Sequence, residues 1–219
     1  MNSILFFEKN RKYFLLIAVI FVATFFVGYF LDIQSIKLIS KPLPVLILAF
    51  IIPKKTKYQK LIFYGLLFSV LGDLLLEIHA DLFIFGLLAF LFAHVSYVLA
   101  FLNRKQTVEG IVALILLAVG ISFFIFIYTG LGDLKIAVAI YMLVILTMVW
   151  RAFAQRKTDK FAHLAFFGAL LFMFSDMNIA FDKFYITYEH SSLVIMITYW
   201  FAQFMIFLAA EKSEIRALT

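Results

Sequence analysis

The sequence predicts an all-α, polytopic membrane protein: an eight-transmembrane-helix bundle with both termini cytoplasmic. Three observations predict this fold. First, 65% of the 219 residues are hydrophobic and only 15% are charged, whereas about 25% of the residues in soluble domains are charged. Second, the hydrophobic residues fall into separate runs long enough to cross a bilayer. Third, lysine and arginine are abundant in every second connection between these runs and scarce in the others. We expect one integral membrane domain over residues 1–219.

Apolar windows of about 20 residues define the expected spans, because this length of helix crosses the hydrocarbon core. The first window follows a basic start and lacks a small-residue cleavage site, so we interpret it as an uncleaved span rather than a signal peptide. The second is the shortest and contains Pro42 and Pro44, so its start is expected to be irregular. The connections are too short for a further domain. The spans are expected at roughly 13–31, 38–53, 61–78, 83–102, 108–128, 134–151, 161–181 and 192–210.

Lysine and arginine are distributed unevenly between the two sides of these spans. Only Lys37, Lys135 and Lys183 lie in the connections on one side, and Lys41 lies at the start of the second span. This asymmetry predicts cytoplasmic termini by the positive-inside rule. It also explains the net charge of +6 without a nucleic-acid partner. The other fifteen cations are Lys9, Arg11, Lys12, Lys54, Lys55, Lys57, Lys60, Arg104, Lys105, Arg151, Arg156, Lys157, Lys160, Lys212 and Arg216.

Familiar site motifs do not occur in this sequence. The chain has no cysteine, which excludes disulfides and thiolate metal sites. It has no nucleophile elbow, no zinc-protease motif and no phosphate loop. The four histidines fall on different expected sides and depths, so they do not predict a metal set. We therefore expect chemistry without a metal or cofactor. The histidines are His79, His94, His163 and His190.

Two aspartates lie inside expected spans, where a charged residue costs roughly 2.5–3.5 kcal/mol and generally has a partner or a function. At 1.5 Å per residue, Asp73 lies ~20 Å beyond Lys60 and Asp176 lies ~24 Å beyond Lys160. Both are thus expected at similar heights in the outer half of the bilayer. They are the candidate catalytic residues. The candidate substrate-binding residues, also polar and within or near the spans, are Lys41, Glu77, His94, Tyr97, Tyr141, Tyr199 and Gln203.

Each candidate also has a purely structural interpretation. The aspartates could bind Lys41 or cap neighbouring helices, and Lys41 could instead extend to the headgroups. A solvated position is favoured for Glu77, near the outer surface. A packed, hydrogen-bonded His94 is about as plausible as a substrate contact. The tyrosines and Gln203 are more often interhelical hydrogen-bonding residues than catalysts.

Two aspartates brought together in a low-dielectric pocket cannot both ionise cheaply, so one stays protonated while the other is a carboxylate. Such a pair offers a general acid and a general base. This chemistry suits acetal or enol-ether hydrolysis, in which the acid donates a proton and the anion stabilises the oxocarbenium ion or activates water. The same pair could carry protons in a transporter.

Several motifs in order along the chain resemble the YhhN-like family, whose animal members are lysoplasmalogenases. The most specific is the segment from Gly168 to Asp176, and the resemblance covers nearly the whole chain with its eight spans. One departure follows Ser175-Asp176, where Asn178 stands among positions that are usually apolar. The motifs are Lys41-Pro42-Leu43, Leu71-Gly72-Asp73-Leu74-Leu75-Leu76, Phe92-Ala93-His94-Val95-Ser96-Tyr97, Gly168-Ala169-Leu170-Leu171-Phe172-Met173-Phe174-Ser175-Asp176 and Tyr199-Trp200-Phe201-Ala202-Gln203.

The resemblance implies hydrolysis of the vinyl-ether bond of lysoplasmalogens to a fatty aldehyde and a glycerophospho-ethanolamine or glycerophosphocholine. It implies that one of Asp73 and Asp176 is the acid, while the other positions water or stabilises the cation. Lys41 would hold an aspartate ionised or contact the phosphate, and His94, Tyr97, Tyr199 and Gln203 would line the pocket. A bacterial cytoplasmic membrane is the expected location, and another ether or lipid ester is an alternative substrate. The oligomeric state stays open.

Two other classes of function stay open at the sequence level. A small-molecule or proton-coupled transporter would be favoured by an inverted repeat with broken helices in both halves. The three prolines, at 42, 44 and 53, all lie in the first half, which does not match that pattern. In a non-catalytic assembly protein, Asp73 and Asp176 would only hold helices together.

Overall fold

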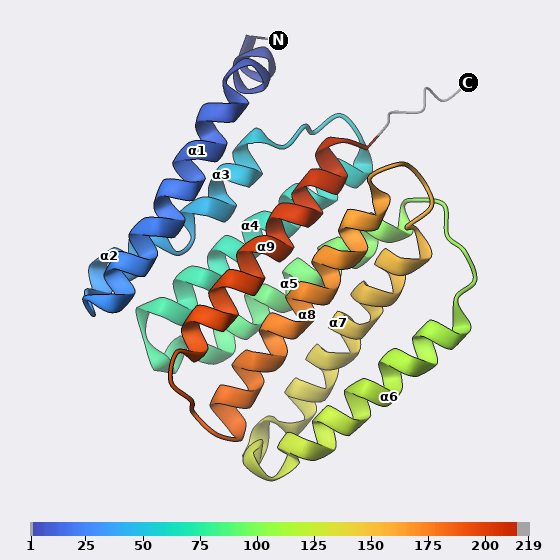
Figure 1. The fold of residues 1–219 in the computed structure, drawn as a ribbon. Coiled ribbons are helices and arrows are strands. Elements are labelled where there is room, and N and C mark those ends of the chain that lie inside the picture. The colour runs from blue at the N-terminus through green and yellow to red at the C-terminus, as the bar shows by residue number, and fades with distance from the viewer. Residues whose placement is uncertain (1, 214–219) are drawn as a thin grey trace. The chain divides into compact units, whose positions relative to one another are not determined.

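The computed structural model describes the backbone of residues 2–213 and the side chains of residues 10–213 (Figure 1). This part of the chain is helical and contains no strand. Lys9 and Arg216, two of the predicted cytoplasmic cations, lie outside the described side chains. The prediction of eight spans is confirmed: the described segments long and apolar enough to cross a membrane are Asn10–Phe30, Gln34–Ile51, Lys57–Ile78, Ala80–Leu102, Gly110–Gly130, Gly132–Ala154, Ala162–Phe184 and Ser191–Glu211.

The chain divides into two compact units, with the boundary between Ser96 and Tyr97 inside α5 (Phe83–Leu102). Unit 1 precedes this boundary and unit 2 follows it. Each unit buries its own set of helix faces. That the whole chain is a single membrane domain stays a prediction.

In unit 1, α1 (Asn2–Phe30) packs against α2 (Gln34–Ser40) and α3 (Leu43–Ile51), and α3 packs against α4 (Lys57–Ile78). The second span is irregular, as the prolines predict: a turn at Lys41 and Pro42 separates α2 from α3. The span begins at Gln34 rather than near residue 38, because α2 supplies a short helix before the break.

Gly72 on α4 leaves room for an aromatic ring of α5 next to one candidate site residue. A Cβ atom at Gly72 would lie 2.6 Å from Cε2 of Phe90 on α5, far inside van der Waals contact. At its other end α4 begins with a capping box. The Gln59 backbone N–H donates to the Thr56 hydroxyl, and the Gln59 side-chain oxygen accepts from the Thr56 backbone N–H. The Phe90 ring therefore packs directly against the α4 backbone at Gly72, one residue before Asp73. After α4 the chain forms the short helix η1 (Ala80–Leu82).

Unit 2 contains α6 (Gly110–Ile127), α7 (Lys135–Ala154), α8 (Ala162–Phe184) and α9 (Ser191–Glu211), with η2 (Tyr128–Gly130) and η3 (Gly132–Leu134) between α6 and α7. Figure 1 shows these four long helices side by side, in the order α6, α7, α8, α9. The most extensive packing joins α8 to α9. A Cβ atom at Gly168 would lie 2.8 Å from the carbonyl oxygen of Ala202, so glycine there allows the two backbones to touch.

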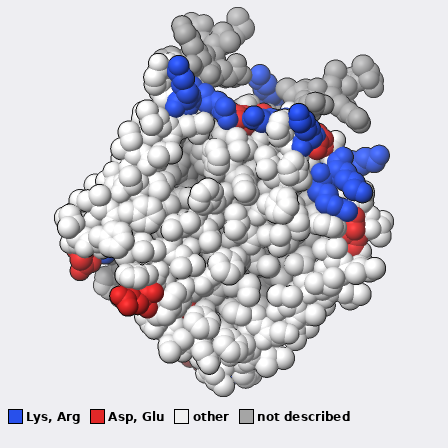
Figure 2. Space-filling model, viewed as in Figure 1, with Lys and Arg blue, Asp and Glu red and all other residues white. Residues whose placement is uncertain are grey.

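Polar contacts join the α5–α6 connection to the end of α7 and the segment after it. The Arg156 guanidinium donates to the Glu109 carboxylate at 2.7 Å, and the Trp150 indole N–H donates to the Glu109 carbonyl oxygen at 2.9 Å. The hydrogen bond from Arg156 lowers the pKa of Glu109. Nearby, Arg104 forms an ion pair with Asp159. On the face drawn in Figure 2 the flanks of the helices are mostly uncharged and the charged side chains stand near helix ends, which fits a protein surrounded by lipid.

Candidate active site

Asp176 lies on the buried face of α8 in unit 2, where its side chain contacts α7. It is 9% exposed, and the Tyr141 hydroxyl on α7 donates a hydrogen bond to its Oδ2 atom. The neighbouring Ser175 hydroxyl donates to the Ile195 carbonyl oxygen of α9 at 3.0 Å. Consecutive residues of α8 therefore bond to the helices on either side, and these bonds fix the rotation of α8 about its axis.

An aromatic and amide cluster lies next to Asp176 within unit 2. Phe172, one turn before Asp176 on α8, packs edge-to-face against the rings of Tyr97 and Tyr199, with centroids at 6.3 Å and 5.3 Å. The Tyr97 hydroxyl donates to Oε1 of Gln203 at 2.7 Å. Three of the predicted pocket residues are thus brought together around Phe172.

The Gln203 amide group is a buried donor with no protein acceptor among the described residues. The side chain is 0% exposed, and its Nε2 atom has no hydrogen-bond partner in that part of the chain. Leaving a buried donor unsatisfied costs about 1–3 kcal/mol, so such a group needs an explanation. An oxygen atom of a bound molecule is one kind of acceptor that would satisfy this donor.

Unit 1 holds the other candidate catalytic residue and a buried cation. Asp73 on α4 is 1% exposed. One turn later on the same helix, the Glu77 carboxylate accepts a hydrogen bond from Lys41 Nζ at 2.9 Å, and both side chains are largely shielded from solvent. Lys41 lies at the turn between α2 and α3, where its own backbone keeps helical φ and ψ angles. Glu77 therefore forms an ion pair. The sequence had favoured a solvated position for it instead.

His94 on α5 in unit 1 is fully buried. The prediction that Asp73 and Asp176 meet in one pocket concerns residues of different units and stays a prediction. Among the described residues, no group of three or more His, Asp or Glu side chains is arranged to hold a metal ion.

Sequence analysis missed the specific partners of several residues. It named Tyr141 only as a pocket residue, whereas the structure makes it the hydrogen-bond donor to Asp176. It did not single out Phe172, although the spacing of four before Asp176 was a usable signal. It noted Asn178 as a departure from the family pattern. The structure shows why a polar residue fits there: its amide donates to the Phe174 carbonyl oxygen at 2.8 Å and its Oδ1 accepts from the Tyr188 hydroxyl at 2.8 Å.

A carboxyl group that accepts a hydrogen bond from a phenol can serve as an acid or as a base, depending on which atom holds the proton. Its buried position excludes bulk water, so a proton transferred there goes to a bound molecule or to a neighbouring side chain. The adjacent rings of Tyr97, Phe172 and Tyr199 are themselves buried. The unit 2 cluster therefore holds a carboxyl group placed for proton transfer in an apolar environment.

The chain as a whole is similar to known proteins. The sequence model of the YhhN family matches residues 36–210. Lysoplasmalogenase TMEM86B of Homo sapiens is 36% identical over 178 residues, which cover 80% of this chain and 75% of that protein. Lysoplasmalogenase TMEM86A of Bos taurus is 37% identical over 163 residues, 70% of this chain and 66% of that protein. No solved structure matches the chain.

Proposed function

Because the chain belongs to the YhhN family, we propose that it is a membrane-embedded hydrolase of the lysoplasmalogenase type. It cleaves the vinyl-ether bond of a lysoplasmalogen and releases a fatty aldehyde and a glycerophospho-ethanolamine or glycerophosphocholine. The names of its relatives support this class of reaction. The single structural observation that supports it best is the buried Asp176 carboxyl with its Tyr141 hydrogen bond, in a helix apolar enough to span a membrane.

The proposed reaction begins with proton transfer to carbon. A carboxylic acid protonates the vinyl carbon farther from the ether oxygen, which leaves an oxocarbenium ion at the carbon bonded to that oxygen. Water adds to this carbon and gives up a proton to the second carboxylate, forming a hemiacetal. The hemiacetal hydroxyl then gives its proton to the first carboxylate as the bond to the glycerol oxygen breaks. The glycerol oxygen takes the proton held by the second carboxyl group, and the aldehyde departs. One acid and one base suffice, so the proposal assigns these roles to Asp73 and Asp176 without fixing which is which.

The other candidates receive supporting roles in this proposal. Tyr141 orients the Asp176 carboxyl through their hydrogen bond. The amide hydrogens of Gln203, which have no acceptor among the described residues, bind an oxygen of the substrate. The rings of Tyr97 and Tyr199 line the path of the alkenyl chain. In unit 1 the Lys41 ammonium, held by Glu77, binds the phosphate or holds an aspartate ionised, and the buried His94 lines the pocket.

The finer details of substrate and location belong to the same proposal. The substrate is a single-chain phospholipid with a vinyl-ether chain. The membrane is a bacterial cytoplasmic membrane, with both termini of the protein on the cytoplasmic side. Fifteen of the nineteen cations support this orientation.

Substrate discrimination tests the proposed function directly. Purified protein in detergent is incubated with a lysoplasmalogen or with the matched 1-acyl lysophospholipid, and fatty aldehyde and fatty acid are measured separately. We expect aldehyde from the vinyl ether and no fatty acid from the ester. Fatty acid from the ester without aldehyde from the vinyl ether would show that the protein is an esterase. No product from either lipid would contradict the proposed lysoplasmalogenase activity.

A further inference from the structure

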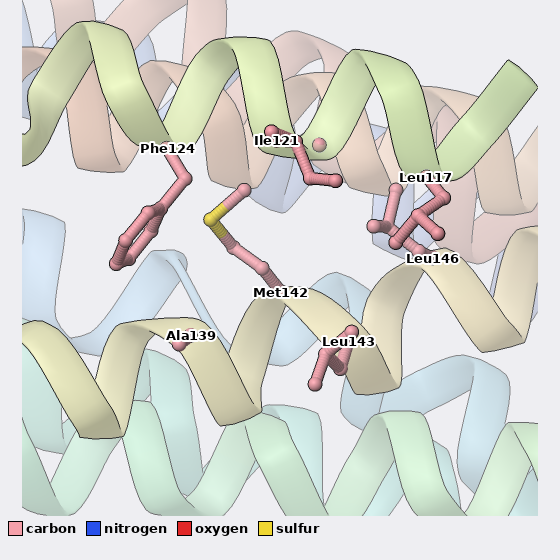
Figure 3. Close-up of a pocket in the computed structure, with 8 residues that line it drawn as sticks. Leu117, Ile121, Phe124, Ala139, Met142, Leu143 and Leu146 are labelled. Carbon is pink, nitrogen blue, oxygen red and sulfur yellow. The ribbon is translucent and has the colours of Figure 1, made fainter.

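An apolar groove lies between α6 and α7 (Figure 3). Its volume is about 170 Å³. Figure 3 shows the Met142 side chain rising from α7 between Phe124 and Ile121 of α6, while Leu146 reaches Leu117 at one end. All the lining side chains are apolar. They include Ile121, Phe124, Ala139, Met142, Leu143 and Leu146.

The groove opens away from the packed interior of unit 2. Ile121 and Leu143, on its two walls, are 51% and 55% exposed, and only 17% of the residues in the α6 span are buried. Both helices are long and apolar enough to cross a membrane. The medium outside the groove is therefore the hydrocarbon of the bilayer.

A cation and an aromatic ring stand at one end of the groove. Lys135 lies one helical turn before Ala139, and its Nζ lies 4.4 Å from the centroid of the Tyr128 ring. The Tyr128 ring packs edge-to-face on Phe124, with centroids 5.8 Å apart. In the part of the chain that the structure describes, no carboxylate forms an ion pair with Lys135. The end of the groove thus presents an ammonium group and a phenol ring at the depth where headgroups begin.

Lys135 and the groove residues of α7 together cover about the depth of one leaflet. From Lys135 to Leu146 the helix rises ~16 Å at 1.5 Å per residue, about half of the ~30 Å hydrocarbon core. We propose that the groove binds one glycerophospholipid of the leaflet at the Lys135 end. Lys135 binds its phosphate, and one acyl chain lies between α6 and α7 over Met142. This assignment uses charge and length together, since an apolar groove alone would not select a phosphate-bearing lipid.

Lipid binding is tested by native mass spectrometry of delipidated protein in detergent, titrated with phosphatidylglycerol. Ala139→Leu fills the groove, and Lys135→Gln removes the cation. The matched controls are Ala137→Leu, on an exposed position of α7, and Lys183→Gln, another cation in the predicted non-cytoplasmic connections. We expect one tightly retained lipid in the wild type and in both controls. Lys135→Gln is expected to weaken retention about fivefold, and Ala139→Leu to abolish the tight site.

Melting temperatures show whether each variant is folded. If Ala139→Leu is not folded, the lipid retention of Lys135→Gln tests the proposal. Wild-type retention in folded Lys135→Gln would overturn the phosphate contact. Equal affinity for oleic acid and for phosphatidylglycerol would overturn the choice of a phospholipid. A dimer that disappears in Ala139→Leu would show that a second copy of the chain occupies the groove. Glycerol phosphate without acyl chains is expected not to compete.

Discussion

At the scale of single residues, the central feature is one carboxyl group with one phenol partner. Asp176 is buried on α8 and Tyr141 donates to it from α7. A hydrogen bond of this kind holds the carboxyl oxygen in one direction, and a catalyst needs that because proton transfer depends on the line between donor and acceptor. Gln203 adds a buried donor with no protein acceptor in the described part of the chain.

Loss of the Tyr141 hydroxyl is expected to reduce turnover while leaving the fold intact. Hydrogen bonds to charged groups contribute about 1.5–3 kcal/mol, so Tyr141→Phe should lower kcat about 10- to 100-fold. Tyr188→Phe is the matched control, because it also removes a tyrosine hydroxyl bonded to α8, at Asn178, away from the site. Aldehyde release and melting temperature are measured for both. Equal activity in the two variants would show that Tyr141 is only a packing residue.

The residue scale also shows the limit of sequence reasoning. Hydropathy and charge gave the depth of Asp176 along its helix, because depth follows from counting residues. Which way the side chain points depends on the rotation of α8 against α7, and no residue count contains that rotation. For this reason Tyr141 was predicted near the site but not as the partner of Asp176. The ion pair of Lys41 with Glu77 was missed because Lys41 was expected to bind an aspartate or extend to the headgroups, and Glu77 was expected to be solvated near the outer surface.

At the scale of helices, small residues determine how the elements that carry the site come together. Gly168 brings α8 against the backbone of α9, and Gly72 brings α4 against Phe90 of α5. The broken second span was predictable, because Pro42 and Pro44 lie in a short apolar run. The exact start of that span was not predictable, because α2 contains the polar residues Gln34, Ser35 and Lys37 and is less apolar than a typical membrane span.

Substitution at the α8–α9 contact is expected to destabilise the protein. A side chain at Gly168 would press on the Ala202 carbonyl oxygen, which belongs to the backbone and cannot move aside cheaply. Overpacking costs about 1–3 kcal/mol, and we expect Gly168→Val at the upper end. Gly110→Ala is the control, because a Cβ atom at Gly110 meets nothing within 4 Å. Thermal unfolding in detergent measures both, and a Gly168→Val protein as stable as the control would contradict the close contact.

The contact of the α5–α6 connection with the end of α7 predicts that the stability of the fold depends on pH. The hydrogen bond from Arg156 lowers the pKa of Glu109. A group whose pKa is lower in the folded state stabilises the fold above its unfolded-state pKa, about 4.3 for glutamate. That stabilisation is lost as the pH falls through the folded-state pKa. We therefore compare the melting temperatures of the wild type and Glu109→Gln. The excess, which is the wild-type value minus the variant value, should be constant between about pH 7 and 6 and shrink below about pH 4.5. An excess that grows in acid would contradict this ion pair.

At the scale of the whole molecule, the number of spans followed from the sequence because a bilayer imposes one length on every crossing helix. The orientation of those spans stays a prediction from the cation distribution. The absence of cysteine makes it measurable, since every introduced thiol is the only thiol. Ser213→Cys is expected to be shielded from a membrane-impermeant maleimide in intact spheroplasts. Thr187→Cys, between α8 and α9, is expected to react. The reverse pattern would invert the predicted topology.

The central claim is that this membrane protein hydrolyses a vinyl ether with two buried aspartates. It is tested most directly by aldehyde release from a lysoplasmalogen by wild type, Asp73→Asn and Asp176→Asn, each shown to be folded by its melting temperature. General acid–base catalysis typically contributes 10²–10⁴-fold, so both variants should lose at least about 100-fold in kcat. If either folded variant keeps wild-type activity, that aspartate is not part of the chemistry and the two-carboxylate mechanism is wrong.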